Sequence, residues 1–172
     1  MTKGARRPIN RWLEPAFAVA ILAGIIHAFW FLATQGYLPP PFFYVPEDTW
    51  MDWFNTALWA HEPGAYDTWR TIYPPVSFVF LRLVTYGPCY YNIETVDARA
   101  CDLYGVFSLH ALFVLNIVLV AWSYSKIDRR TALPRSFAVT AGIPMLFALD
   151  RGNLVIPCFT CLVLAFGPLV RS

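Results

Sequence analysis

The stretch that decides the fold is WLEPAFAVAILAGIIHAFWFLAT, residues 12–34. Its one acidic residue, Glu14, lies near the start, and the remainder is almost entirely apolar. At a rise of about 1.5 Å per residue, a helix of this length crosses a hydrocarbon core of about 30 Å. We therefore expect a first transmembrane span over residues 12–34.

The composition of the whole chain agrees with a membrane environment. Of the 172 residues, 58% are hydrophobic and 14% are charged, whereas a soluble domain usually has about 25% charged residues. A soluble surface this apolar would aggregate. We expect a lipid bilayer as its surroundings and no nucleic-acid partner, because the basic residues lie at the edges of the apolar segments.

The basic residues also predict the orientation. One group precedes the first span (Lys3, Arg6, Arg7 and Arg11), and a second follows residue 125 (Lys126, Arg129, Arg130 and Arg135). Residues 35–72 carry five acidic residues and a single Arg. The positive-inside rule places both basic groups in the cytoplasm. We therefore expect a cytoplasmic N-terminus and an external loop over residues 35–72, as in a protein of the bacterial inner membrane.

The predicted fold is an all-α integral membrane protein with four to five transmembrane or re-entrant helices in a single domain, 1–172. It comprises a cytoplasmic tail (1–11), the first span (12–34), the outer loop (35–72) and the remaining membrane segments (73–172). Within the outer loop, apolar residues recur at helical spacing from Trp50 to Leu58, and Asp48 or Thr49 can cap the helix that they predict. Its Trp residues favour a position at the lipid–water interface.

The segment 73–91 has two interpretations. It is apolar, but Arg82 lies at its centre, and a central Arg costs about 2.5–3.5 kcal/mol on insertion scales. The segment either crosses, with Arg82 paired to an acid, or enters the membrane and returns. Re-entry keeps the basic group 126–135 in the cytoplasm and puts residues 150–153 on the same side of the membrane as Asp52. The charge distribution therefore favours re-entry.

The four cysteines form two pairs. Cys89 and Cys101 flank a polar segment that we expect outside, where they form either a disulfide or two free thiols. Cys158 and Cys161 lie in an apolar run without a second pair. Two buried small apolar residues are the preferred reading there, over a zinc or redox site.

Two groups of residues could carry chemistry. Asp48 and Asp52 are four residues apart, so they share one face of the predicted helix. The pair could supply a general base or bind a cation, or it could simply form a solvated acidic face. Asp150-Arg151-Gly152-Asn153 interrupts two apolar runs. It is either an ordinary interfacial turn or a phosphate site, because the guanidinium of Arg suits phosphate. Tyr73, which opens Tyr-Pro-Pro, is structural by default, and His61 beside Glu62 is weak evidence for a metal or catalytic site.

The order of these pieces resembles the N-terminal part of the GT-C glycosyltransferases. Asp52 lies in the first outer loop, Gly64-Ala65-Tyr66 precede Tyr73-Pro74-Pro75, and Arg151-Gly152-Asn153 follows a later span. The polyprenyl-phosphate-mannose-dependent mannosyltransferases of glycosyltransferase family 87 are the most similar group. Members are longer than this chain, so the resemblance implies an N-terminal module or a truncated relative.

The resemblance implies a hexosyltransferase or mannosyltransferase that uses a polyprenyl-phosphate-sugar donor. Asp52 would be the general base, with Asp48 beside it, and Arg151, Asn153, Tyr73 and His61 would bind the substrates. It implies no resident metal ligands, and it leaves open whether a divalent cation assists. The alternative is a non-catalytic accessory subunit that docks on other membrane subunits. A channel has little support, because the spans lack a row of polar residues.

Overall fold

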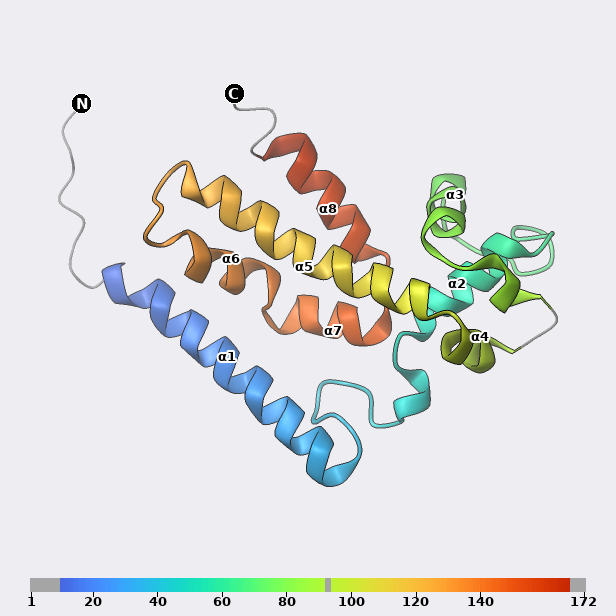
Figure 1. Cartoon of the computed structure of the whole chain (residues 1–172), viewed down its shortest axis with the longest axis horizontal. Helices are drawn as coiled ribbons and strands as arrows, with labels where there is room; N and C mark the ends of the chain where they lie inside the picture. Colours follow the sequence, from blue (N-terminus) through green and yellow to red (C-terminus); the bar gives the residue numbers. More distant parts are fainter. Residues whose placement is uncertain (1–9, 92–93, 168–172) are drawn as a thin grey trace.

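The computed structural model describes residues 10–91 and 94–167, and all the regular structure in this part is helical (Figure 1). The α-helices are α1 (Asn10–Gln35), α2 (Met51–His61), α3 (Pro75–Val84), α4 (Thr95–Cys101), α5 (Leu103–Ser125), α6 (Ala132–Thr140), α7 (Ile143–Arg151) and α8 (Val155–Phe166). Two short 3-10 helices are η1 (Pro46–Asp48) and η2 (Gly87–Tyr90). The all-α prediction is confirmed.

Within the described residues, the helices α1 and α5 are each long and apolar enough to cross a membrane. A third crossing results if α6 and α7 together form one broken span, since they meet at a bend of 52°. Gly142 and Pro144 lie at this bend, and Pro suits the first turn of a helix but not its interior. Two or three helices of this chain are therefore suited to membrane insertion.

The helices form two groups (Figure 1). The long helix α5 packs against α6 and α8, and α1 packs against α6. The short helices α2, α3 and α4 contact one another through α2 and make a separate lobe at the N-terminal end of α5. We call α2, α3, α4 and η2 the loop lobe.

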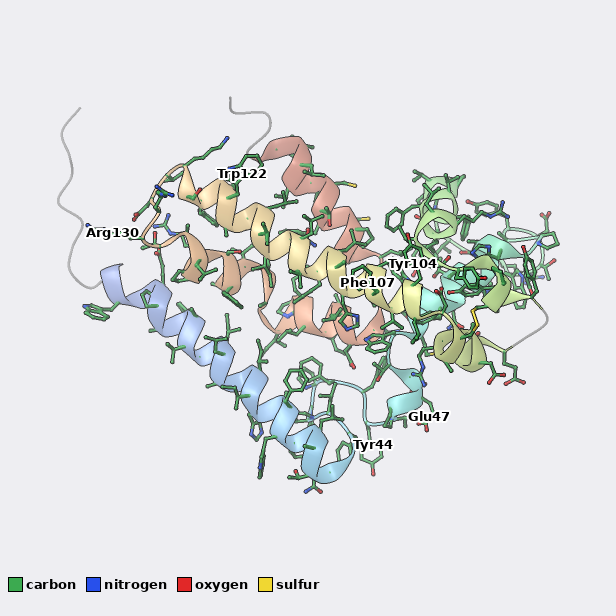
Figure 2. All side chains as sticks on the ribbon, in the orientation of Figure 1. Tyr44, Glu47, Tyr104, Phe107, Trp122 and Arg130 are labelled. Atoms are coloured by element: carbon green, nitrogen blue, oxygen red, sulfur yellow. A yellow bond between two sulfur atoms is a disulfide. The ribbon has the colours of Figure 1, made fainter. Side chains whose placement is uncertain are left out.

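The basic stretch 126–135 and the outer loop lie at opposite ends of the long helices. Arg135 of α6 forms an ion pair with Glu14 of α1 at 2.8 Å, so the basic stretch 126–135 lies beside the start of α1. Figure 2 shows Arg130 and Trp122 at this end, and Tyr44 and Glu47 at the other end. The predicted cytoplasmic tail, 1–11, falls mostly outside the described residues.

The segment 73–91 does not contain a long helix. Its helix α3 has 10 residues, which at 1.5 Å each span about half of a hydrocarbon core. Within the described residues, Arg82 forms no ion pair with an acid; its Nε donates to the backbone oxygen of Ala60 in the last turn of α2, where carbonyl oxygens lack helical partners. Re-entry of this segment stays a prediction.

The helix α2 differs from its prediction in two ways. It begins at Met51, because Trp50 takes a left-handed conformation with φ of 65° and becomes the N-cap. Asp48 ends η1 instead, so it does not share a helical face with Asp52, and neither Asp48 nor Thr49 caps α2. The aromatic face is also directed inward: Trp53 and Phe54 are fully buried in the protein core, so they do not face lipid headgroups as expected.

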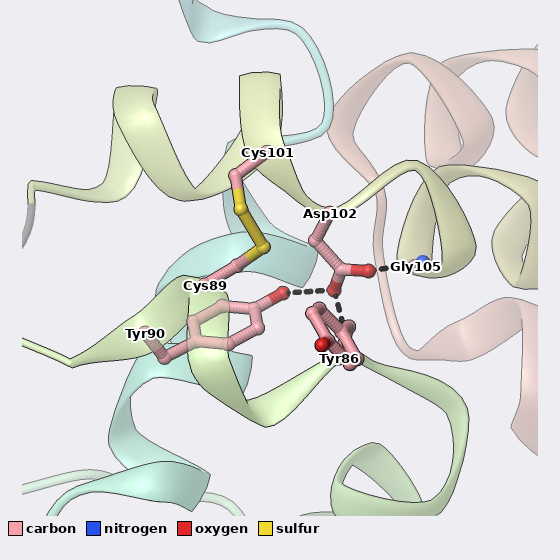
Figure 3. The surroundings of a disulfide bond; sticks show 6 residues. All are labelled: Tyr86, Cys89, Tyr90, Cys101, Asp102 and Gly105. Carbon is pink, nitrogen blue, oxygen red and sulfur yellow. Dashed lines mark hydrogen bonds between the residues drawn. A yellow bond between two sulfur atoms is a disulfide. The ribbon is translucent and has the colours of Figure 1, made fainter.

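A disulfide links two helices of the loop lobe, η2 and α4, and a buried carboxylate beside it joins the lobe to α5 (Figure 3). Cys89 bonds to Cys101, which decides between the two alternatives left open by the sequence. Next to it, Asp102 caps α5 by accepting from the N–H of Gly105 at 2.7 Å, and it also accepts from the hydroxyl of Tyr90 at 2.6 Å. Burial raises the pKa of the Tyr90 phenol, so this group remains a donor.

The second pair of cysteines was predicted wrongly. Cys158 and Cys161 lie on α8 with exposed side chains, rather than buried as small apolar residues. Both side chains are on the outer surface of the helix group.

Candidate functional site

The candidate site is built on an ion pair between two distant parts of the chain. Arg151, the last residue of α7, donates from Nε to Asp52 Oδ2 at 2.9 Å and from Nη2 to Asp52 Oδ1 at 3.1 Å. Asp52 lies in the first turn of α2, where the helix dipole also favours a negative charge. The pair is bidentate, which fixes the relative orientation of the two side chains. Both side chains are partly exposed.

Asn153 completes the group around the carboxylate. Its Nδ2 donates to Asp52 Oδ2 at 3.2 Å, and its Oδ1 accepts from the N–H of Val155 at 3.0 Å. The second bond holds the amide at the start of α8. Asp52 therefore accepts three hydrogen bonds from the segment 151–153, and these bonds fix the position of its carboxylate.

A glycine allows the two segments to approach. Gly152 has a φ of 68°, and a Cβ at this position would lie 2.8 Å from both the Trp50 oxygen and the Trp53 Cβ. The neighbouring main chains are also bonded directly, because the N–H of Trp50 donates to the oxygen of Asp150 at 2.7 Å. The turn after α7 thus lies directly against the start of α2, and this contact brings Arg151 to Asp52.

Aromatic rings cover the guanidinium. The Cζ of Arg151 lies 5.2 Å from the ring centre of Phe43 and 5.9 Å from that of Phe147, which are cation–π distances. The N–H of Phe43 donates to Asp150 Oδ2 at 2.9 Å. Phe43 thereby links the outer loop to both charged residues at the end of α7.

Not all the predicted site residues meet here. Asp52, Arg151 and Asn153 are in contact, and Tyr73 lies close enough to Arg151 for an electrostatic interaction. Asp48 lies in η1 with an exposed side chain. His61 is the last residue of α2, nine residues after Asp52, or about 13.5 Å along the helix axis.

His61 belongs to the core of the loop lobe instead. Its ring stacks on Tyr90 with centroids 4.9 Å apart, and its Nε2 lies 3.0 Å from Thr85 Oγ1. Burial, together with the nearby positive charge of Arg82, lowers the pKa of His61. These contacts give it a packing role, not a place beside Asp52.

Several residues of the site environment had no signal in the sequence. Phe43 contributes through its ring and its N–H, and Trp50 through its left-handed backbone. Arg99 of α4 donates from Nη1 to the backbone oxygens of Pro46, Glu47 and Thr49 at 2.9–3.0 Å, which holds the segment leading to α2. All these contacts join residues far apart in the chain.

The arrangement can accept a proton and bind an anion. The ion pair uses Nε and Nη2 of Arg151, and its Nη1 takes no part in it. Within residues 10–91 and 94–167, no cluster of three or more His, Cys, Asp or Glu side chains could hold a metal ion. Comparison with protein-family models, curated proteins and solved structures finds no match to this chain.

Proposed function

We propose that this chain is a membrane glycosyltransferase-like protein, which transfers a sugar from a polyprenyl-phosphate donor to a hydroxyl acceptor. The observation that supports it most strongly is the contact of Asp52 with Arg151 and Asn153. This group lies at the end of the molecule opposite the basic stretch 126–135. In a bacterial inner membrane, that end faces outward.

In the proposed reaction, Asp52 acts on the acceptor and Arg151 acts on the donor phosphate. One oxygen of Asp52 takes the proton of the acceptor hydroxyl while the hydroxyl oxygen attacks the anomeric carbon. The bond from that carbon to the phosphate oxygen breaks, its electron pair stays on the phosphate, and the anomeric configuration inverts. Arg151 stabilises the departing phosphate through Nη1. Asp52 gives up one of its three hydrogen bonds when the acceptor binds.

The test is a transfer assay with the full chain in proteoliposomes. Labelled polyprenyl-phosphate-mannose is supplied with an alkyl mannoside acceptor, and wild type is compared with Asp52→Asn. We expect a loss of at least about 100-fold, the usual contribution of a general base. Asp67→Asn is the matched control, because Asp67 is an exposed acid of the same loop outside the site. Absence of transfer by wild type, or equal loss in both variants, contradicts the proposal.

One observation favours the alternative, an accessory subunit of a larger membrane complex. Among the described residues of α1, Ala18 alone is buried within this chain, so a partner helix could cover the rest. Under this alternative, α1 cross-links to another membrane protein in native membranes, and Asp52→Asn leaves the activity of that complex unchanged.

A further inference from the structure

An apolar groove runs between α1 and α7, and residues of the outer loop also line it. It consists of two adjoining cavities of about 380 and 210 Å³, which share Ile25, Ala28, Phe42 and Leu146 as lining residues. Along α1 the lining residues run from Phe17 to Phe29, a length of about 18 Å at the helical rise. A long alkyl or isoprenoid chain would fit this length and these walls.

The groove ends at a buried carboxylate. Asp150 lines the smaller cavity and is 5% exposed. Its Oδ2 accepts from the N–H of Phe43, but its Oδ1 has no hydrogen-bond partner among the residues that the structure describes. Arg151, next in the chain, points to Asp52. A buried carboxylate oxygen without a donor is costly, so a donor supplied by a ligand would stabilise this end of the groove.

A second acceptor lies at the same end. His110 lines the smaller cavity, and its Nδ1 is 2.8 Å from the backbone oxygen of Val106. Because a carbonyl oxygen only accepts, Nδ1 carries the hydrogen, and Nε2 of the neutral ring is then an acceptor. The ring of Trp50 meets the His110 ring edge to face at 5.0 Å and holds it in place. The end of the groove therefore presents acceptors.

We infer that this groove binds a single-chain amphiphile whose head group donates hydrogen bonds, either a hydroxyl or an ammonium group. The head contacts Asp150 Oδ1 and His110, and the chain lies along α1. Since Oδ1 is almost fully covered, the head reaches it after a small rotation of a neighbouring side chain. An anionic head is repelled by the carboxylate. The inference does not depend on glycosyl transfer, because it concerns binding at Asp150 and not at Asp52.

The test uses three photoreactive probes with the same long chain and different heads: hydroxyl, primary ammonium and carboxylate. The full chain is placed in phosphatidylcholine nanodiscs, and saturable labelling is mapped to peptides of α1 and α7. We expect saturable labelling by the hydroxyl or the ammonium probe, and about tenfold less by the carboxylate probe. The stronger of the two donor probes identifies the head group.

Asp150→Asn reverses the polarity of the site. The amide oxygen would take the N–H of Phe43, so the NH₂ group would occupy the place of Oδ1 and donate. We expect labelling by the donor probes to fall about tenfold, the effect of losing one hydrogen bond to a charged group, and labelling by the carboxylate probe to rise.

A second pair of variants keeps the test decisive if Asp150→Asn does not fold. Ala28→Trp fills the groove where its two cavities adjoin, without changing Asp150, and Ala23→Trp adds the same side chain to an exposed position of α1 that does not line the groove. Only the first should abolish labelling. Equal labelling by all three probes, or equal loss in both tryptophan variants, would show an ordinary surrounding lipid and overturn the inference.

Discussion

The helices α1 and α2 are both rich in apolar and aromatic residues, but they use them differently. Among the described residues of α1, only Ala18 is buried in the chain, whereas α2 buries six of its eleven residues. In α1 apolar residues surround the helix, as lipid requires. In α2 they form one face, which covers the core of the loop lobe. The same composition therefore serves lipid contact in one helix and protein packing in the other.

Substituting one tryptophan in each helix gives the largest expected difference. Trp53 of α2 is fully buried and Trp30 of α1 is 59% exposed. Trp53→Ala should lower the free energy of unfolding by about 3–5 kcal/mol, because it leaves a cavity. Trp30→Ala should cost below about 1 kcal/mol, because lipid or detergent fills the space. Denaturant unfolding in detergent micelles measures both. Similar costs in the two variants would show that α1 is as closely packed as α2.

Substitution of the two cysteine pairs gives the next largest difference in the free energy of unfolding. Serine at Cys89 and Cys101 removes the covalent link of the loop lobe and should cost about 2–4 kcal/mol. Serine at Cys158 and Cys161, which are free and exposed on α8, should change the unfolding free energy by less than about 0.5 kcal/mol. A reductant should lower the stability of wild type by the same amount as the first double variant. No response to the reductant would mean that the disulfide does not form in the folded protein.

Substitution of two glycines by alanine tests how closely the turn after α7 packs on α2. Gly152→Ala places a Cβ against Trp50 and Trp53 at a φ of 68°, and should cost about 1–3 kcal/mol through strain and close contact. Gly24→Ala in α1 meets nothing within 4 Å, and it should stabilise the helix by about 0.5–1 kcal/mol. The same unfolding measurement decides. If Gly152→Ala is neutral, then the turn after α7 does not pack on α2.

The smallest effect is the pH dependence from His61. Burial and Arg82 lower its pKa in the folded state from the ordinary 6.5, so below pH 6.5 the unfolded chain binds more protons than the folded chain. Stability should therefore be complete above pH 6.5 and should fall as the pH decreases toward the lowered pKa. His61→Gln should remove this part of the slope. An unchanged slope in His61→Gln would mean that the ring stays accessible to protons.

The sequence predicted the local features of the fold well. The span expected at 12–34 corresponds to α1, because a long apolar run needs only lipid to become a helix. It failed where distant contacts decide the backbone. The left-handed Trp50 depends on its bond to Asp150, and this moved the start of α2 and separated Asp48 from Asp52.

The candidate site was predictable only in part. Asp52, Arg151 and Asn153 belong to short motifs whose residue types suggest chemistry, and the structure brings them into contact. Phe43 acts through its ring, and Arg99 acts through hydrogen bonds to backbone oxygens. No local sequence pattern indicates either contact. His61 was selected for its residue type alone, and its surroundings in the loop lobe give it a different role.

The central claim is that Asp52 and Arg151 interact directly and join the loop lobe to the end of α7. A double-mutant cycle with Asp52→Asn, Arg151→Gln and the combined variant tests this, with the unfolding free energy in nanodiscs as the readout. For a partly exposed bidentate pair we predict a coupling of about 1 kcal/mol or more. Effects that add to within about 0.5 kcal/mol would contradict the direct interaction, and with it the site on which the proposed function depends.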